Sequence, residues 1–210
     1  MKRLGLFGGT FDPVHVGHVA MVRRALEWGL DEVVVVPCRQ SPHKPVRDGV
    51  PLPTDGAHRW EMLRLGFEGV AGVSFSRCEL DREGPSYTRD TVAELRLTRP
   101  GGEWVLILGA DQLPALHRWV GFDEWAPGMW FLIFGRPGCA PDIGSPALRG
   151  LRAAVIRDFE IPVSATEIRE RLRRGEAVEG LLPEGVEAYI RRHGLYLPGE
   201  AAGQSPTAFL

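Results

Sequence analysis

Residues 8–18 read Gly-Gly-Thr-Phe-Asp-Pro-Val-His-Val-Gly-His and directly follow a short apolar run at residues 4–7. The two glycines permit a tight turn and let a ligand's phosphates approach the backbone closely. A helix that begins near Gly17 would direct its first N–H groups and its positive dipole end at the same place. His15 and His18 lie three residues apart at this helix start, so both imidazoles can face the turn. This stretch, hereafter the phosphate loop, predicts an anion cradle after the first strand of an α/β sheet.

Five further short apolar runs follow along the chain, at residues 33–36, 73–75, 104–108, 130–134 and 153–156. Their continuous hydrophobicity indicates strands that are covered on both faces, as in a parallel sheet. Stretches with helical spacing lie between them. After the phosphate loop, for example, Val22 and Ala25 share one helix face while Arg23 and Arg24 occupy the other. We therefore predict an α/β fold with a Rossmann-like doubly wound parallel sheet, which binds ligands at the carboxyl edge of its strands.

From Ser164 onward the sequence predicts a helical region. Ser164 is a helix N-cap candidate, and Glu167 follows three residues later as in a capping box. A last helix is predicted over residues 183–192, with Pro183 in its first turn and Gly194 just past its end. Beyond it, the composition favours a frayed tail. We expect one domain with an α/β core at 1–162, a small helical part at 163–197 and a disordered tail at 198–210.

The composition is that of a soluble globular protein, with 210 residues, 44% apolar and 25% charged residues, and a net charge of −2. Such a charge gives no general attraction to nucleic acid or anionic membranes, so phosphate binding must come from local groups. Cys38, Cys78 and Cys139 are too scattered for a disulfide framework or a close metal-ligand pair. No apolar run approaches a signal-peptide core or the roughly 20 residues that span a bilayer. We expect a cytoplasmic protein.

Alternative interpretations of the phosphate loop are limited. A Gly8-Gly9 pair alone can be an ordinary turn. The loop has neither Gly-x-Gly-x-x-Gly nor P-loop spacing, so dinucleotide hydride chemistry and Walker-type hydrolysis lack their signatures. His15 and His18 could bind zinc, but no third ligand is evident, and we predict no protein-held metal. Two imidazole donors beside glycines instead suit phosphate oxygens and the charge that builds on them in a transition state.

The complete loop resembles the signature of the nucleotidyltransferase superfamily that carries the His-x-Gly-His motif. This superfamily includes mononucleotide, phosphopantetheine and glycerol-phosphate nucleotidyltransferases. Its two motif histidines contact the phosphates of ATP, and it uses no protein nucleophile. The resemblance implies that His15 and His18 are the catalytic residues. It also implies that Gly8, Gly9 and Thr10 lie at the ATP phosphates.

The stretch Val163-Ser164-Ala165-Thr166-Glu167-Ile168-Arg169 resembles the second signature of this superfamily, Ile-Ser-Ser-Thr-x-Ile-Arg, which grips the ATP phosphates. The chain departs from it by a valine in the first position and by Ala165 in place of the second serine. A hydroxyl-rich helix start followed by an arginine makes an anion site, although an ordinary capped helix would have the same pattern. The resemblance implies ATP contacts for Ser164, Thr166 and Arg169.

Four further features each have an ordinary interpretation as well. Gly109-Ala110-Asp111-Gln112 follows an apolar run, and Ser86-Tyr87-Thr88 precedes a predicted helix. In both places polar side chains could simply cap a helix. Trp119 could belong to the core. Lys44 lies in a proline-rich stretch, residues 37–53, that predicts a long loop over the sheet edge, where a lysine could merely be solvated.

Together, and in this order, the landmarks resemble bacterial nicotinate mononucleotide adenylyltransferases, from Lys2 to about Leu197. In that family the Gly-x-Asp element lies by the nucleotide, which implies that Gly109 and Asp111 bind ATP. The Ser-Tyr-Thr segment and the Thr-Phe of the first loop offer backbone N–H groups to the pyridine carboxylate. A tryptophan stacks on the pyridine ring, and a His-Lys loop approaches the phosphates. The residues implied to bind the mononucleotide are therefore Thr10, Phe11, Lys44, Ser86, Tyr87, Thr88 and Trp119.

The reaction implied is ATP plus nicotinate mononucleotide giving deamido-NAD and pyrophosphate in NAD biosynthesis, with Mg²⁺ arriving on ATP. The expected partners are these two substrates, with no nucleic acid and no membrane. Transfer to nicotinamide mononucleotide or phosphopantetheine stays open as an alternative. A non-catalytic nucleotide-sensing domain is a remote one. A class I aminoacyl-tRNA synthetase fragment is disfavoured because the chain lacks the length and the basic surface that tRNA requires. The sequence leaves open a homo-oligomer, the degree of nicotinate preference and the motion of the 37–53 loop.

Overall fold

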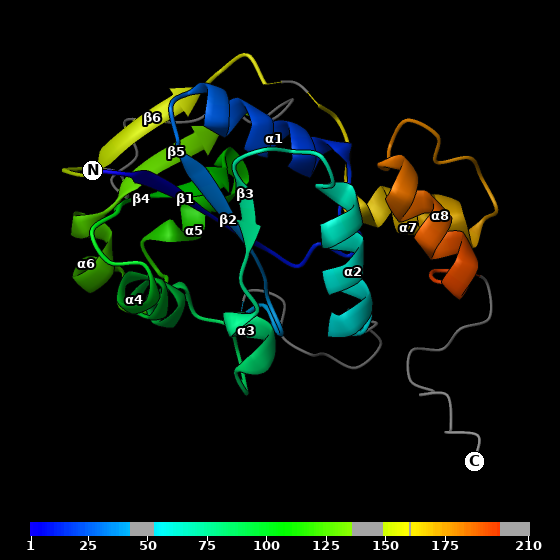
Figure 1. Cartoon of the computed structure of the whole chain (residues 1–210), viewed down its shortest axis with the longest axis horizontal. Coiled ribbons are helices and arrows are strands. Elements are labelled where there is room, and N and C mark those ends of the chain that lie inside the picture. The colour runs from blue at the N-terminus through cyan, green and yellow to red at the C-terminus, as the bar shows by residue number, and fades with distance from the viewer. Residues whose placement is uncertain (43–52, 136–148, 160, 198–210) are drawn as a thin grey trace.

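A computed structural model describes residues 1–42, 53–135, 149–159 and 161–197. Lys44, Cys139, the tail at 198–210 and most of the predicted 37–53 loop lie outside the described residues. The centre of the described part is a six-stranded sheet in which every pair of neighbours is parallel (Figure 1). Its order is β3-β2-β1-β4-β5-β6.

Each strand contains one of the six predicted apolar runs. The strands are β1 (Arg3–Gly9), β2 (Glu32–Pro37), β3 (Val73–Phe75), β4 (Glu103–Gly109), β5 (Trp130–Phe134) and β6 (Arg152–Ile156). The doubly wound parallel sheet is therefore confirmed, with strand bounds that differ from the apolar runs by at most two residues.

Successive residues of the strands serve opposite faces of the sheet. Val33 and Val35 of β2 belong to one hydrophobic core cluster, and Val34 and Val36 belong to the other. All four side chains are fully buried. Because both faces are covered at this stretch, none of its four positions is polar, and this explains the continuous apolar run in the sequence.

The helices divide between the two faces. The first core cluster receives side chains from α1 (Val16–Glu27), α2 (Gly56–Gly66), α7 (Ala165–Arg173) and α8 (Glu184–His193). The second receives them from α4 (Thr88–Thr98), α5 (Leu113–Leu116) and α6 (Phe122–Trp125). Short elements α3 (Cys78–Asp81), η1 (Ala110–Gln112) and η2 (Ala126–Gly128) lie in the connections. None of the described helices is long and apolar enough to cross a membrane.

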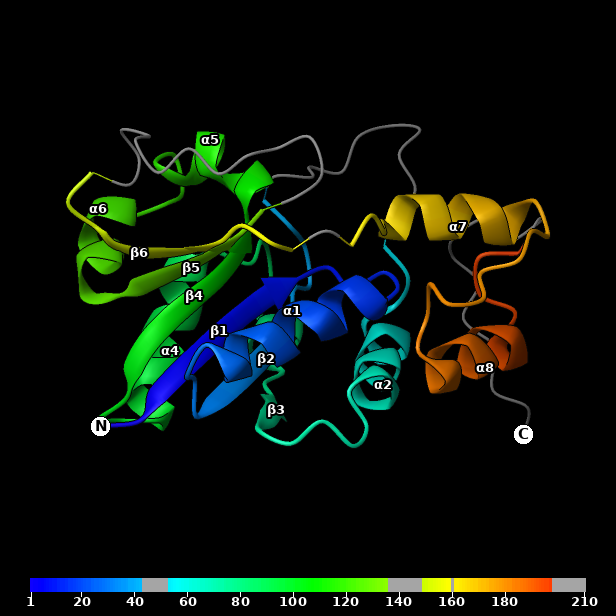
Figure 2. The ribbon, with the colours of Figure 1, turned by 90° about the horizontal axis from the view of Figure 1, so that it is seen from above.

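The C-terminal helices α7 and α8 lie beside α2, beyond the end of the sheet that is away from the N-terminus (Figures 1 and 2). The predicted cap of α7 is confirmed, because the Ser164 hydroxyl accepts a hydrogen bond from the backbone N–H of Glu167 at 3.1 Å. Gly194 ends α8 in the left-handed region, with a φ of 64°, as predicted. Pro183 is the N-cap of α8 rather than a residue of its first turn.

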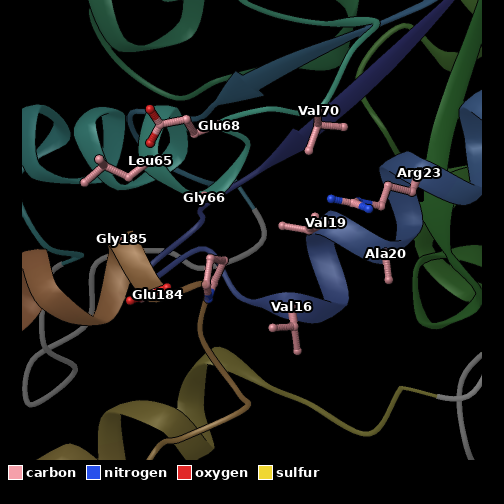
Figure 3. A pocket seen from close by; sticks show the side chains of 11 residues that line it. Val16, Val19, Ala20, Arg23, Leu65, Gly66, Glu68, Val70, Glu184 and Gly185 are labelled. Atoms are coloured by element: carbon pink, nitrogen blue, oxygen red, sulfur yellow. The ribbon is translucent and has the colours of Figure 1, made fainter.

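A groove of about 510 Å³ lies between α1, the end of α2 and the start of α8 (Figure 3). Its wall is mainly aliphatic and includes Val16, Val19, Leu65 and Val70, with Arg23 at one side. None of the predicted site residues lines it. The predicted site therefore lies elsewhere, at the carboxyl ends of the strands.

Candidate functional site

The site is built where the strand order reverses. The chain passes from β1 to β2 on one side and returns to β4 on the other, so the connections leave the carboxyl ends of β1 and β4 in opposite directions. β1 and β4 are paired as far as Leu6 and Leu106, and Gly9 and Gly109 each lie three residues beyond that pair. Such a switch point opens a crevice for ligands. The phosphate loop and the Gly-x-Asp element both begin there.

Phe11 folds the phosphate loop back over the end of β1. Its φ is 50°, in the left-handed region, and its side chain is almost fully buried. The ring meets that of Phe7 edge to face, with centroids 5.4 Å apart. A Cβ on Gly9 would lie 2.9 Å from the Phe11 ring, so only glycine fits at this position. The Asp12–Pro13 peptide bond that follows is cis.

The two predicted catalytic histidines are brought together at the start of α1. Their rings are stacked, with centroids 3.6 Å apart. The backbone N–H of His15 donates to Nδ1 of His18 at 3.2 Å, which assigns the proton of a neutral His18 ring to Nε2. His15 is 6% exposed and His18 is half-buried, so His18 is the more accessible of the two. A Cβ on Gly17 would lie 3.1 Å from His15 Nδ1.

The C-terminal part of the chain braces the phosphate loop through Asp12. Arg169 on α7 donates from Nη1 to the backbone oxygen of Asp12 at 2.6 Å and from Nη2 to the Thr166 hydroxyl at 3.4 Å. The Tyr196 hydroxyl donates to Asp12 Oδ1 at 2.7 Å. Burial, with the charge of Asp12, raises the pKa of Tyr196 far above its ordinary value. The second signature thus contacts the first through Arg169. The sequence did not indicate that Asp12 and Tyr196 would join them.

Arg59 is a further support of the site that the sequence did not reveal. It lies on α2 and is 2% exposed. Its guanidinium donates to the backbone oxygens of Thr10 at 2.8 Å, Cys38 at 2.7 Å and Thr54 at 2.8 Å. These three carbonyls belong to the loops after β1 and β2 and to the entry of α2. Because the acceptors carry no formal charge, the guanidinium also leaves a buried positive charge beneath the phosphate loop.

Residues 86–88, the acceptor segment, lead into α4. The Ser86 hydroxyl accepts a hydrogen bond from the backbone N–H of Arg39 at 3.1 Å, and the Ser86 N–H donates to the Gln40 oxygen at 2.9 Å. The N-cap of α4 is Tyr87, and no side chain caps the helix. The alternative of a simple hydroxyl N-cap cluster is therefore wrong. The segment is instead tied to the chain that leaves β2, with a helix N-terminus directly behind it.

The other predicted residues lie on two further elements. Asp111 is exposed in η1, directly after β4, and accepts a hydrogen bond from Gln112 Nε2 at 2.8 Å. Neither η1 nor α5 has a side-chain cap, so Asp111 is not the helix cap that the alternative assumed. Trp119 is half-buried and packs partly against the second core cluster, with its ring centroid 6.4 Å from that of Trp125. Its packing role and its predicted stacking role are thus both compatible with this placement.

Known proteins give a consistent picture. The family model described as Cytidylyltransferase-like matches residues 6–171. A Bacillus subtilis protein named nicotinate-nucleotide adenylyltransferase is 39% identical, over 93% of this chain and 99% of its own length. A Gloeobacter violaceus protein named as a probable nicotinate-nucleotide adenylyltransferase is 41% identical, over 93% and 96%.

Among solved structures, Plasmodium falciparum nicotinic acid mononucleotide adenylyltransferase complexed with NaAD has a TM-score of 0.75. It covers 93% of this chain and 98% of its own, at 19% sequence identity, and so shows the same fold. The family match covers most of the chain, and each of the two more similar relatives covers 93% of it. The chain therefore belongs to the Cytidylyltransferase-like family, in the group of the nicotinate-nucleotide adenylyltransferases.

Proposed function

We propose that the protein transfers the adenylyl group of ATP to nicotinate mononucleotide, giving deamido-NAD and pyrophosphate. The observation that carries this proposal is the stacked His15–His18 pair on a glycine loop at the switch point, with Arg169 bound to the same loop. Imidazole, guanidinium and helix N–H groups converge there, and all of them suit phosphate oxygens. The relatives at 39% and 41% identity carry the name of this activity.

In the proposed reaction, a phosphate oxygen of the mononucleotide attacks the α-phosphorus of ATP in line, and pyrophosphate leaves. This oxygen is already ionised at neutral pH, so no general base is required. Catalysis then consists of positioning and charge neutralisation. We assign to His18 the stabilisation of the charge that builds on the phosphoryl oxygens, through its Nε2–H donor. His15, Thr10, Lys44 and Arg169 would hold the phosphates.

The ATP side would comprise the phosphate loop, the element after β4 and the start of α7. The carboxylate of Asp12 within this cradle accepts hydrogen bonds from Tyr196 and Thr54. The remaining groups are mostly cations and N–H donors, which fit phosphates rather than a metal ion. Mg²⁺ would accordingly be held by the phosphates of ATP, where it supplies further charge neutralisation. The residues assigned to ATP are Gly8, Gly9, Thr10, His15, His18, Gly109, Asp111, Ser164, Thr166 and Arg169.

The mononucleotide side would comprise the acceptor segment, the backbone of Thr10 and Phe11, and Trp119. Backbone N–H groups at the start of α4 are well matched to the negative charge of a pyridine carboxylate. The amide of nicotinamide would turn its NH₂ toward these donors, and this mismatch favours nicotinate. Trp119 would offer an aromatic surface to the electron-poor pyridine ring.

A substrate panel tests the proposed function. The purified protein is supplied with ATP and Mg²⁺ together with nicotinate mononucleotide, nicotinamide mononucleotide, phosphopantetheine or no acceptor, and pyrophosphate and dinucleotide are measured. We expect deamido-NAD to form with a kcat/KM at least about tenfold above that for nicotinamide mononucleotide. Equal or better turnover of another acceptor would transfer the assignment to that acceptor. A lack of pyrophosphate release from every acceptor would favour a nucleotide-sensing domain.

A further inference from the structure

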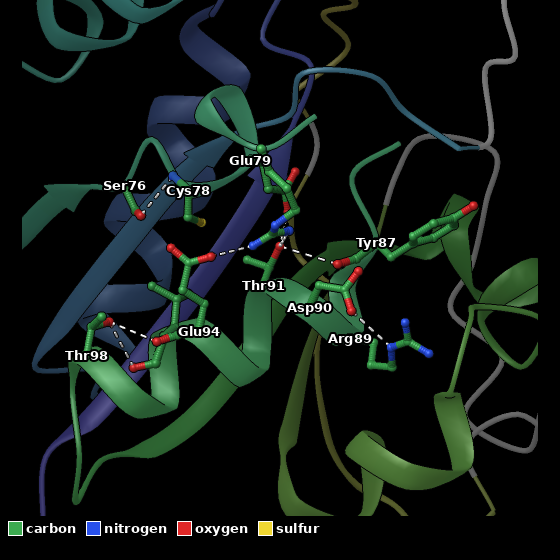
Figure 4. A network of polar contacts seen from close by, with 11 residues as sticks. Ser76, Cys78, Glu79, Tyr87, Arg89, Asp90, Thr91, Glu94 and Thr98 are labelled. Atoms are coloured by element: carbon green, nitrogen blue, oxygen red, sulfur yellow. Dashed lines mark hydrogen bonds and ion pairs between the residues drawn. The ribbon is translucent and has the colours of Figure 1, made fainter. Parts of the chain in front are cut away.

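Glu79 is a buried carboxyl group behind the acceptor segment. It lies on α3, between β3 and α4, and is 7% exposed. Figure 4 shows its side chain directed at Thr91 on the facing side of α4. Carboxyl groups are rarely buried without hydrogen-bond donors, because leaving water costs them several kcal/mol. The groups that donate hydrogen bonds to Glu79 therefore show which segments it holds in place.

Two hydroxyl groups bind Glu79. The Thr91 hydroxyl donates to Glu79 Oε1 at 2.6 Å. It also lies 3.4 Å from the Tyr87 oxygen, but a hydroxyl has one hydrogen, and the shorter contact takes it. The Ser86 side chain supplies the second hydrogen bond. The Ser86 oxygen accepts from the Arg39 N–H, so its own hydrogen is available for Glu79.

The carboxyl group thus joins the two ends of one short stretch. Ser86 opens the acceptor segment, and Thr91 lies in the first turn of α4. Both are themselves buried, at 8% and 1% exposed. Between them lie the backbone N–H groups of the helix start. A carboxyl group fixed by two hydroxyls therefore fixes the direction in which those N–H groups point.

Charged neighbours hold this arrangement from outside. Arg82 donates to the Thr91 hydroxyl at 3.4 Å and to Glu94 at 2.5 Å. Burial raises the pKa of Glu79 above its ordinary value, although the hydrogen bonds from Thr91 and Ser86 oppose the rise. If the acceptor were removed, two buried hydroxyls would lose their partner. The acceptor segment would then keep its contacts with Arg39 and Gln40 but lose its connection to α3.

We propose that Glu79 is a positioning residue for the mononucleotide side of the site. It holds the N–H groups of the acceptor segment in the arrangement that receives a pyridine carboxylate, and so sets the preference for nicotinate over nicotinamide. Glu79 acts through Ser86 and Thr91 and does not touch the substrate. This inference rests on the proposed function, and it concerns the affinity for one substrate rather than the chemical step.

The test compares three variants. Glu79→Ala removes the acceptor, Thr91→Val removes one hydroxyl at constant shape, and Thr91→Ser keeps that hydroxyl. We expect Glu79→Ala to raise the KM for nicotinate mononucleotide about tenfold or more, while the KM for ATP changes less than about twofold. The kcat/KM ratio of nicotinate to nicotinamide mononucleotide should fall several-fold. Thr91→Val should raise the KM for nicotinate mononucleotide in the same selective way but to a smaller degree. Thr91→Ser should have KM values close to those of the wild type.

Glu32→Gln is the matched control. Glu32 is a half-buried carboxylate that also accepts from a hydroxyl, Ser74 at 2.5 Å, and pairs with Arg99. It starts β2, at the opposite edge of the sheet from the site. This variant should leave both KM values within about twofold of wild type. A general effect of losing a buried carboxylate would change the KM values of Glu32→Gln and Glu79→Ala alike.

The possible results separate the inference from the proposed function. Failure of the wild-type protein to make deamido-NAD would overturn the function itself. A working wild type whose Glu79→Ala variant is folded, by its circular dichroism spectrum and Tm, but has an unchanged KM for nicotinate mononucleotide would overturn the inference. So would an equal rise in both KM values. If Glu79→Ala does not fold, the difference between Thr91→Val and Thr91→Ser decides.

Discussion

The ATP side and the mononucleotide side of the site are each stabilised by a different part of the chain. The phosphate loop is braced from far away in sequence. Asp12 is bound by Arg169, which is 157 residues distant, and by Tyr196, which is 184 residues distant. The acceptor segment is held by residues that are less distant in sequence, Arg39 being 47 residues from Ser86. Glu79 and Thr91 are 12 residues apart.

This difference predicts which kinetic constants a substitution in each part of the chain should change. The ATP side depends on the C-terminal helices being folded against α1 and α2, because Arg169 and Tyr196 come from that region. The acceptor side is built almost entirely within α3, α4 and the chain after β2. Substitutions in the C-terminal part should therefore change the kinetics of ATP, whereas those around α4 should change the kinetics of the mononucleotide.

The largest effect is expected at the junction of the two sides. His18→Ala should lower kcat about 100-fold or more, the scale of losing one donor that stabilises a developing oxyanion. Steady-state rates of pyrophosphate release measure it. His193→Ala, which removes an exposed histidine at the end of α8, is the control and should keep a normal kcat. Near-normal turnover of the His18 variant would remove His18 from the catalytic assignment.

The next largest effect is expected from the loss of the hydrogen bond between Arg169 and Asp12. Arg169→Ala should raise the KM for ATP about 20-fold, because the hydrogen bond to the loop and the proposed charge-assisted bonds to phosphates would be lost together. The KM for nicotinate mononucleotide should change much less. Arg171→Ala, on the same helix but paired with Glu167, is the control. Equal rises in the two KM values would contradict the separation of the two sides.

A smaller effect is expected on the opposite side. Trp119→Ala should raise the KM for nicotinate mononucleotide about tenfold, since stacking on an aromatic ring contributes roughly 1–3 kcal/mol. The KM for ATP should be nearly unchanged. Trp60→Ala, a tryptophan on α2 that packs beside Arg77, is the control. A lowered Tm with an unchanged KM would show that Trp119 serves only the core.

The sequence predicts the strands and the motif residues of this site better than the residues that hold them in place. The six strands are apparent because a strand buried on both faces has no polar positions, as in Val33 to Val36. Gly8, Gly9 and the histidines are apparent because they form one continuous motif. The helices α3, α5 and α6 were not predicted, since four residues are too few to show a helical period.

The supporting residues could not be predicted for a different reason. Arg59 and Glu79 look like ordinary surface residues in the sequence, because arginine and glutamate are usually exposed, and Tyr196 carries no pattern that ties it to Asp12. Their roles depend on which loops meet in three dimensions, and no local pattern reports that. A buried arginine facing three carbonyls and a buried glutamate facing two hydroxyls become visible only when the fold brings these groups together.

The smallest effect is expected for the hydrogen bond between Tyr196 and Asp12, which are 184 residues apart. Tyr196→Phe removes the hydroxyl that donates to Asp12 and leaves a buried carboxylate oxygen without that donor. We expect the free energy of unfolding to fall by about 1–3 kcal/mol at pH 8 and the KM for ATP to rise only about threefold. Tyr189→Phe, which removes a hydroxyl bound to His58 on α2, is the control and should leave the KM for ATP unchanged.

The stability difference between wild type and Tyr196→Phe should itself depend on pH. Because the pKa of Tyr196 is raised in the folded protein, the unfolded chain releases this proton first, near pH 10. The stabilisation is therefore fully present below pH 10 and is lost as the pH rises further, by up to about 1.4 kcal/mol per pH unit. Denaturant unfolding of both proteins from pH 8 to 11 measures this loss. A difference that stays constant across this range would mean that the Tyr196 hydroxyl is not buried beside Asp12, contrary to the structure.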